Sequence, residues 1–359
     1  MSGIKDVAKR AGVSISTVSN VLNRSKYVSP ELVKRVEQAV QELSYEVDPI
    51  ARSMKSNRSG TIGVIVEDMC GVFYPYIVKG INSVVVEKGY QLIICDAQSV
   101  YGDANAVRRE RELFKKLFAS RVDGILFVTM IQNDLVEQHF REIFKRSSQS
   151  KRIPVVSLER DLTHVGIDSV YFDGYSNARM AVEHLIDCGC KKIGHITGPV
   201  VMQVAKERIQ GYKDCILEHG LLADWDRQVE YGDYSHQSGY LAMKRLLEHM
   251  PDLDGVFCGN DQMAVGALKL LKEYGKRVPE DMKVIGYDDV FLSSIIEPSL
   301  STVHIQKTHT GIKAAQMLFQ RIEHPKENAE PIGVKMSARL VVRKSTVADT
   351  AEEWIFVDW

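Results

Sequence analysis

The sequence predicts an α/β protein with a small all-α head and a two-lobed, doubly wound body. Three observations support this prediction. Residues 4–44 contain three short stretches of helical periodicity, strand-like runs alternate with amphipathic helices from Thr61 onward, and the same alternation starts again near residue 173. At 359 residues, the chain is long enough for a small domain and two lobes that each bury a core.

The start of the chain predicts two short helices joined by a tight turn. The first helix has a small apolar face, made by Val7, Ala8 and Ala11. Gly12 can adopt the left-handed conformation that ends a helix, and Ser14 is placed to cap the next helix, residues 15–22. A third helix from Pro30 to about residue 44 completes a small bundle with a thin core.

The second of these helices has an unusual outward face. Where a surface helix usually shows Glu and Lys, it shows hydroxyls, amides and an isoleucine: Ile15, Ser16, Ser19, Asn20 and Asn23. Those groups suit base edges and phosphate oxygens. Any small helical hairpin could share part of this pattern, but the spacing is typical of a helix-turn-helix whose second helix enters the major groove.

Residues 48–56, with the sequence DPIARSMKS, form a short segment with two interpretations. Asp48 and Pro49 are good start signals for a helix, and Ile50, Ala51 and Met54 would share one of its faces. The eight residues that follow Asp48 are too few for a helix to stand alone in water, where roughly 12–15 are already marginal. The segment is therefore either a bare linker or a helix that forms only on a partner.

Charge is distributed unevenly along the chain. The formal net charge is −1, yet residues 1–60 carry ten Lys and Arg against six Asp and Glu. A basic head on an acidic body suits a polyanion bound at one end only. No apolar run reaches the ~18 residues of a membrane span and no signal peptide is evident, so we expect a cytoplasmic protein. The six cysteines are scattered, so we expect neither disulfides nor a zinc site.

The body predicts two series of parallel strands. The first series of strands comprises residues 61–66, 90–96, 122–129 and 153–159; the second comprises residues 191–197, a run near Val229, and residues 254–260 and 282–288. Residues 301–305 look like a further crossing between the lobes, followed by a helix at 308–323 and terminal strands within 331–343. Together they predict a doubly wound architecture in each lobe.

Polar side chains gather where these strands end. Ligands of open parallel sheets meet the carboxyl ends of the strands, where the chain offers Asp68, Phe73, Tyr74, Arg160, Asp161, Arg208, Asn260, Asp261 and Asp288. Carboxylates can accept from neighbouring hydroxyls, Arg donates in a fixed fork, and an aromatic ring can cover an apolar sugar face. Asp68 and Asp261 could equally cap helices, and Phe73 could belong to the core.

The stretch IKDVAKRAGVSISTVSNVLN, residues 4–23, resembles the amino-terminal signature of the LacI/GalR family of bacterial repressors, particularly its purine and ribose repressors. The likeness continues across nearly the whole chain. It implies a body of periplasmic-binding-protein type I architecture, with three crossings between the lobes and an effector held in the cleft. It also implies that residues 48–56 are a hinge helix that forms on DNA, with Met54 as an apolar wedge in the minor groove, followed by a linker to Gly60.

The resemblance also implies roles for individual side chains. Ile15, Ser16 and Asn20 would read bases, and Thr17, Ser19 and Asn23 would hold phosphates. The implied effector contacts are Phe73, Tyr74, Arg160, Arg208, Tyr234, Asn260 and Asp288. Two positions depart from the family: Met202 stands where the purine repressor has a base-reading Arg, and residues 304–307 read HIQK where HQPK is usual. The first departure argues against a purine, which leaves a pentose, a hexose or a sugar phosphate.

These observations divide the chain into four parts. Residues 1–47 are the helix-turn-helix domain, 48–60 the hinge and linker, 61–343 the body, and 344–359 a tail with an apolar end. Within the body, the expected amino-terminal lobe is 61–172 plus a segment near 290–323. The expected carboxyl-terminal lobe is 173–289 plus 324–343.

The function expected from the residues and the resemblance is a sequence-specific repressor controlled by a sugar-like effector. We expect it to bind a palindromic DNA operator as a homodimer, since the tail lacks the leucine heptads of a tetramer. Control by a partner protein is an alternative, and a transport-type binding protein is a weaker one. Catalytic motifs are missing, and His304 and His309 lack an adjacent acid, so we expect no enzyme activity, cofactor or metal.

Overall fold

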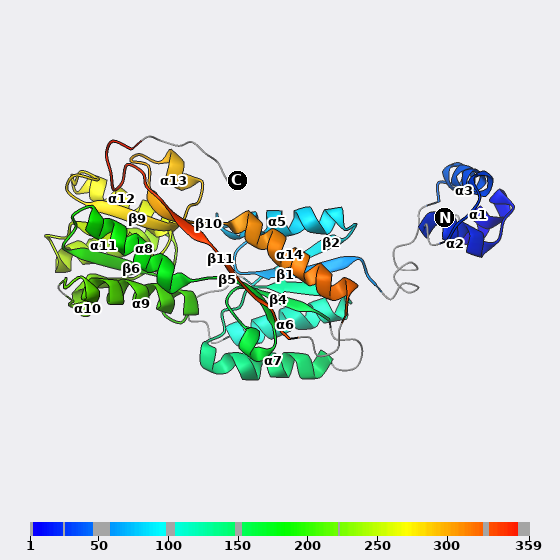
Figure 1. Ribbon diagram of the computed structural model, residues 1–359, viewed down its shortest axis with the longest axis horizontal. Coiled ribbons are helices and arrows are strands. Elements are labelled where there is room, and N and C mark those ends of the chain that lie inside the picture. The colour runs from blue at the N-terminus through cyan, green and yellow to red at the C-terminus, as the bar shows by residue number, and fades with distance from the viewer. Residues whose placement is uncertain are drawn as a thin grey trace. The chain divides into compact units, whose positions relative to one another are not determined.

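The computed structural model describes residues 3–23, 26–45, 58–97, 105–147, 153–221, 223–325 and 330–350, and the chain divides into two units, residues 1–59 and 60–359 (Figure 1). Met54, with the rest of the predicted hinge up to residue 57, lies outside the described residues, as does the apolar end at 351–359. Within the described ranges, no helix combines the length and apolarity needed to cross a membrane.

The first unit contains three helices, α1 (Ile4–Ala11), α2 (Ile15–Asn23) and α3 (Pro30–Glu42). Their small core consists of Val7, Ala8, Ala11, Val18, Val36 and Ala39. Gly12 ends α1 with φ 64°, and Ser14 Oγ accepts a hydrogen bond from the Thr17 backbone N–H at 3.1 Å. Both predicted caps are therefore confirmed. Arg35 of α3 donates to the Ala11 carbonyl at 2.7 Å, which ties the turn to the third helix.

The first lobe of the second unit is built on a six-stranded sheet with the order β11-β5-β4-β3-β1-β2. Its strands are β1 (Thr61–Val66), β2 (Gln91–Asp96), β3 (Gly124–Phe127), β4 (Val155–Glu159), β5 (Asp168–Phe172) and β11 (Gly333–Met336). Helices α5 (Tyr74–Glu87) and α14 (Lys307–Glu323) pack on one face, and α6 (Ala106–Ala119) and α7 (Asn133–Ser147) pack on the other. Strand β5 was not predicted.

The second lobe repeats this arrangement, with the strand order β12-β10-β9-β8-β6-β7. Its strands are β6 (Ile193–Thr197), β7 (Val229–Tyr231), β8 (Gly255–Cys258), β9 (Lys283–Asp288), β10 (Ser301–Ile305) and β12 (Ala338–Val341). Helices α8 (Gly174–Asp187) and α9 (Gln203–Glu218) cover one face, and α11 (His236–His249) and α12 (Asp261–Glu273) cover the other. Two short helices, α10 (Trp225–Gln228) and α13 (Leu292–Ile295), complete it. The predicted doubly wound α/β body is thus present in both lobes.

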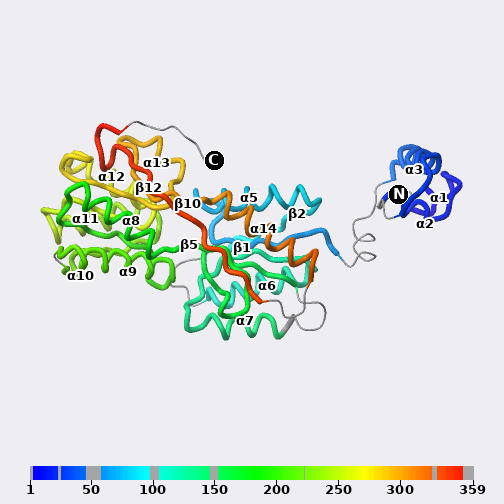
Figure 2. The backbone as a smooth tube through the Cα atoms, viewed as in Figure 1, coloured from blue at the N-terminus to red at the C-terminus, as the bar shows by residue number. Residues whose placement is uncertain are grey.

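The chain passes between the lobes three times, between β5 and α8, between β10 and α14, and between β11 and β12 (Figure 2). These crossings correct the predicted division of the carboxyl-terminal segments. Residues 290–305 belong to the second lobe, because β10 is fully buried there between β9 and β12. Strand β11 belongs to the first lobe, because it pairs with β5. The predicted lobe segments 290–323 and 324–343 are therefore each split by a crossing.

Two glycines allow α5 and α14 to pack in direct backbone contact. A Cβ atom on Gly80 would overlap the carbonyl oxygen of Thr308, and one on Gly311 would overlap that of Ile77. The second lobe has the same close helix–helix contact, since Gly239 and Gly266 allow the backbones of α11 and α12 to touch. Any side chain at these positions would force the helices apart.

We predict that Gly311→Ala lowers the free energy of unfolding by about 1–3 kcal/mol, because the added methyl group meets backbone that cannot yield as a side chain would. Urea unfolding monitored by circular dichroism measures the loss. Lys313→Ala, at an exposed position of the same helix, is the control and should change stability by less than about 0.5 kcal/mol. Equal stability of the two variants would contradict the close-contact explanation.

Candidate functional site

A cavity of about 440 Å³ lies at the carboxyl ends of strands from both lobes of the second unit. Its walls come from the loops that follow β1, β4, β6, β7, β8 and β9, as the rule for open parallel sheets predicts. The volume suits a small molecule of one or two rings. Six of the seven predicted effector residues line it: Phe73, Tyr74, Arg208, Tyr234, Asn260 and Asp288.

Arg160 is the predicted effector residue that does not line this cavity. Its buried guanidinium donates to the Ile131 carbonyl at 2.5 Å and to Asn133 Oδ1 at 2.5 Å. Asn133 in turn donates to Gln203 Oε1 in the second lobe at 2.7 Å. Arg160 therefore supports a hydrogen-bonded link between the lobes, and the structure gives it no contact with the cavity.

Glu159, the residue before Arg160, lies at the cavity instead of Arg160. Glu159 lines the wall, and the Tyr74 hydroxyl lies 2.8 Å from Glu159 Oε2 and 3.0 Å from Glu67 Oε2. Burial raises the pKa of Glu159, although the hydrogen bond from Tyr74 and the charge of Arg208 oppose that rise. Glu67 and Glu159 both end predicted strands, so the strand-end rule could have found them.

Arg208 enters the cavity from α9 and lies over an aromatic ring. Its Nη1 donates to the Gly259 carbonyl at 2.5 Å, and its guanidinium carbon lies 3.8 Å from the centre of the Tyr287 ring. Burial alone would lower the pKa of Arg208, but Tyr287, Tyr234, Asp288 and Glu159 together raise it above its ordinary value. The side chain is therefore a fixed positive charge that can donate to a ligand.

Asp288 ends β9 in the cavity wall and is the least compensated of its carboxyl groups. Its side chain is 7% exposed and accepts no hydrogen bond from any residue that the structure describes. Burial raises its pKa to about 7, against the opposing charges of Arg208 and Lys307. A buried carboxyl that faces an open cavity without a partner is suited to accept hydrogen bonds from a ligand.

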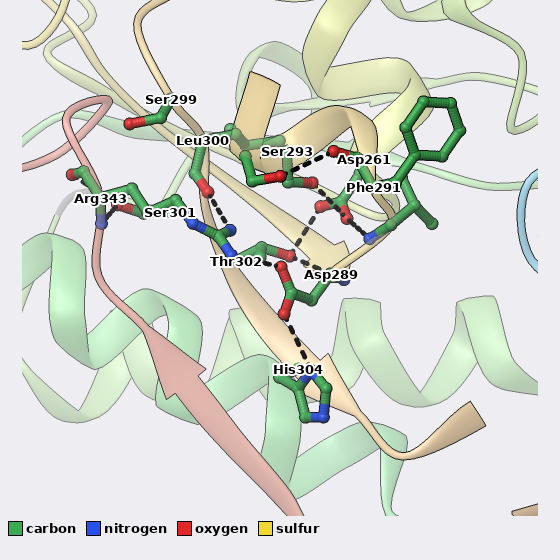
Figure 3. Close-up of polar contacts among 12 residues, drawn as sticks. Asp261, Asp289, Phe291, Ser293, Ser299, Leu300, Ser301, Thr302, His304 and Arg343 are labelled. Atoms are coloured by element: carbon green, nitrogen blue, oxygen red, sulfur yellow. Dashed lines mark hydrogen bonds and ion pairs between the residues drawn. The ribbon is translucent and has the colours of Figure 1, made fainter. Parts of the chain in front are cut away.

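A buried polar network surrounds Asp289, the residue that follows Asp288 in the chain (Figure 3). Asp289 accepts from His304 Nδ1 at 2.8 Å and pairs with Arg343 at 2.8 Å. Asp261 accepts from Thr302, Ser293 and the Val290 backbone N–H. Asp261 therefore has a structural role, and it does not line the cavity.

Lys307 completes this support from the crossing between β10 and α14. It is fully buried, and its ammonium group donates to the carbonyl oxygens of Asp288 at 2.5 Å and Asp289 at 3.0 Å. The turn that carries Asp288 is thus fastened to the segment that joins the lobes. Sequence reasoning missed this role, because a lysine at the start of a helix normally faces solvent.

Strained backbone is concentrated at the cavity. Of the lining residues, Glu159 (φ 69°), Tyr234 (φ 69°) and Asp288 (φ 104°) all have positive φ without being glycine. Each such conformation costs on the order of 1–3 kcal/mol and persists where the surroundings impose it. Asn260 imposes it at Tyr234: its Nδ2 donates to the Tyr234 carbonyl at 3.0 Å, while its Oδ1 caps α12. Asn260 therefore positions the aromatic wall in addition to lining the cavity.

The outward face of α2 agrees with prediction at most of its described positions. Ile15 is 44% exposed, Ser16 is exposed, and Thr17 and Asn20 are half-buried. Ser19 differs, since its side chain is 7% exposed. It lies beside the fully buried Val18, where the helix turns toward the core of the bundle. The side chain of Asn23 lies outside the part of the chain that the structure describes.

Comparison with known proteins agrees with this arrangement. Residues 3–48 match the bacterial regulatory proteins of the lacI family, and residues 182–346 match a periplasmic binding protein-like domain. The HTH-type transcriptional repressor PurR of Pasteurella multocida (strain Pm70) is 34% identical over 345 residues, which cover 96% of this chain and 98% of that repressor. The chain belongs to the LacI family.

Two further relatives extend the likeness. The ribose operon repressor of Escherichia coli (strain K12) is 35% identical over 325 residues, 90% of this chain and 94% of that repressor. A solved structure of the lac repressor dimer bound to operator and the anti-inducer ONPF has a TM-score of 0.84 at 26% identity, over 96% of this chain and 99% of that chain. These relatives confirm the predicted LacI-family fold and the predicted class of function, a DNA-binding transcriptional regulator.

We predict that Lys307→Met lowers the free energy of unfolding by about 1–3 kcal/mol, because the buried carbonyls of Asp288 and Asp289 lose their donor. Chemical unfolding measures the change. Lys313→Met removes an exposed lysine from the same helix and should leave stability nearly unchanged. A Lys307→Met protein as stable as the Lys313→Met control would show that the ammonium does not hold the turn.

Asp288→Asn should alter how stability depends on pH. Because the folded-state pKa of Asp288 is raised to about 7, the folded protein binds its proton more tightly than the unfolded chain does. The unfolding free energy of the unaltered protein should therefore fall as pH rises from about 5 to 7, by on the order of 2 kcal/mol for this group. Asp288→Asn lacks that contribution, so its unfolding free energy should fall less between pH 5 and pH 7. Parallel urea titrations at pH 5 and pH 7 test this, and identical pH slopes would refute it.

Proposed function

We propose that this LacI-family protein is a transcriptional repressor whose affinity for an operator is set by a sugar-like effector bound in the cavity between its lobes. The observation that carries the proposal is the pair of Asp288 and Arg208. One is a buried carboxyl that accepts no hydrogen bond from the described residues, the other is a fixed guanidinium, and both face the same cavity. Together they can accept from and donate to the hydroxyl groups of one ligand.

The DNA contacts proposed for α2 follow from its outward face. Ile15, Ser16 and Asn20 would contact base edges, and Asn20 could pair with adenine through both atoms of its amide. Thr17 would contact a phosphate. Its hydroxyl already lies 2.9 Å from that of Ser14, so the two form a small cluster of donors at the helix start. Asn23 stays a prediction, and Ser19 is better suited to support the helix than to touch DNA.

Two apolar surfaces of the second unit support a homodimer. In the first lobe, Ile93 and Ile94 on the edge strand β2 are 38% and 41% exposed, and Val86 on α5 is 62% exposed. In the second lobe, a groove beside α12 and α13 is lined by Val265, Leu268 and Ile296. Matching surfaces on two copies would place two α2 helices on a palindromic operator. We propose action on cytoplasmic DNA and no catalytic role.

A ligand screen tests the effector part of this proposal. Thermal unfolding of the full chain is measured against sugars, sugar phosphates, amino sugars and nucleosides. A ligand at about 100 times its Kd should stabilise the protein by roughly 2.7 kcal/mol. Asp288→Ala should abolish the response, whereas Glu248→Ala, an exposed acid on α11, should keep it. If no compound in the panel stabilises the protein, the result would contradict control by a small effector.

For the DNA part, we predict that Asn20→Ala weakens binding to the selected operator by about 1–3 kcal/mol, roughly 5- to 150-fold, and leaves binding to random DNA unchanged. Selection from a random oligonucleotide pool supplies the operator, and fluorescence anisotropy at fixed salt gives both affinities. Gln38→Ala, on the exposed side of α3, is the control. If both variants bind the operator like the unaltered protein, Asn20 does not read a base.

A further inference from the structure

Acidic side chains greatly outnumber basic ones in the lining of the cavity. Of the described lining residues, six are carboxylic acids and one is an arginine, and none is Lys or His. The acids are Glu67, Asp68, Asp96, Glu159, Asp233 and Asp288. They come from both lobes, so a ligand in the cavity meets negative charge on either side.

Three cations near the cavity, Arg208, Lys307 and Arg160, donate hydrogen bonds to carbonyl or amide oxygens of the protein. Arg208 already donates to the Gly259 carbonyl and lies over Tyr287. The Lys307 ammonium is directed at backbone carbonyls behind Asp288. Arg160 is turned toward Ile131 and Asn133, on the far side of Glu159 from the cavity.

Backbone N–H groups donate hydrogen bonds to the acids at the rim. Asp68 accepts from the Cys70 N–H at 2.7 Å, and Asp96 accepts from the Met69 N–H at 3.2 Å. Burial would raise the pKa of Asp233, but hydrogen bonds from Ser235 lower it. These three carboxylates give the entrance a negative potential that attracts cations and repels anions.

Two of the inner acids, Glu159 and Asp288, accept few hydrogen bonds from the residues that the structure describes. The single Tyr74 hydroxyl lies within hydrogen-bond distance of Glu67 and of Glu159, yet it has one proton to donate. Asp288 accepts no hydrogen bond from the described residues and is more than nine-tenths buried. A ligand that brings several N–H donors and a positive charge would satisfy Glu159 and Asp288 at once.

We propose that the effector is a hydroxylated molecule that carries a protonated amine, of the chemical class of amino sugars, and that its ammonium group binds between Glu159 and Asp288. This assignment rests on the proposed function of the cavity and narrows its ligand class. The hydroxyl groups would face Arg208 and Asn260, and Phe73 and Tyr234 would cover the ring. Phosphorylated sugars are excluded, because the lining offers a phosphate one guanidinium against six acids.

Isothermal titration calorimetry of the full chain at pH 6.5 tests the assignment. The probes are glucose, galactose and mannose, each offered as the parent sugar, the 2-amino-2-deoxy sugar and the 6-phosphate. In at least one series, we expect the amino sugar to bind tenfold or more tightly than its parent, a difference of about 1.4 kcal/mol. We expect no binding of any 6-phosphate.

Variants connect the preference to the named carboxylates. Glu159→Gln should reduce the advantage of the amino sugar over its parent to less than threefold. Asp68→Asn, at the exposed rim where folding is not at risk, should reduce it by two- to threefold. Glu248→Gln removes an exposed acid of the same lobe as Asp288 and should leave the ratio unchanged. An unchanged ratio in both cavity variants would overturn the assignment.

The outcomes separate this assignment from the proposed function. If a parent sugar or a 6-phosphate binds as tightly as the amino sugar or more tightly, the charge assignment is wrong and control by an effector stands. If none of the nine compounds binds, the assignment is overturned as well. Operator binding that no compound of the wider screen alters would then also count against the proposed function.

Discussion

The rest of the second unit depends on the buried hydrogen bonds and ion pair that hold the turn at the end of β9. Asp288 and Asp289 both have positive φ, and the buried donors Lys307, His304 and Arg343 hold that strained turn in place. The same residues belong to the segments that cross between the lobes or end beside them. One set of hydrogen bonds fixes both the cavity wall and the crossing between β10 and α14. A ligand that binds Asp288 and shifts this turn would therefore also change how the two lobes are positioned.

The helix-turn-helix head and the cavity differ in how fully their polar groups and backbone are satisfied. Around Gly12 and Ser14, the head satisfies its helix ends locally and needs only a thin apolar core to present α2. The cavity instead keeps strained backbone and poorly paired carboxyls, which lower stability until a ligand arrives. A site of this kind stores free energy that binding can release, and a difference in binding energy between two states is what allosteric control requires.

The sequence predicted the head, the doubly wound lobes and most of the cavity, because these follow from periodicity and from the strand-end rule. It predicted Arg160 where the structure places Glu159, because adjacent residues at a strand end point to opposite sides and the pattern does not tell which one faces a ligand. The burial of Lys307 and Ser19 depends on tertiary packing that composition does not reveal. Strand β5 was missed, and the assignment of β10 and β11 to their lobes is decided by pairing with strands that are distant in the sequence.

The central claim is that the cavity and the operator are thermodynamically linked. The most direct test titrates a fluorescent operator with the full chain, with and without a saturating concentration of a compound that the calorimetry or the thermal screen has identified. The account predicts that operator affinity changes by at least fivefold, and that operator DNA changes the affinity for the compound by the same factor. Equal operator affinity in the presence and absence of a bound compound would contradict it.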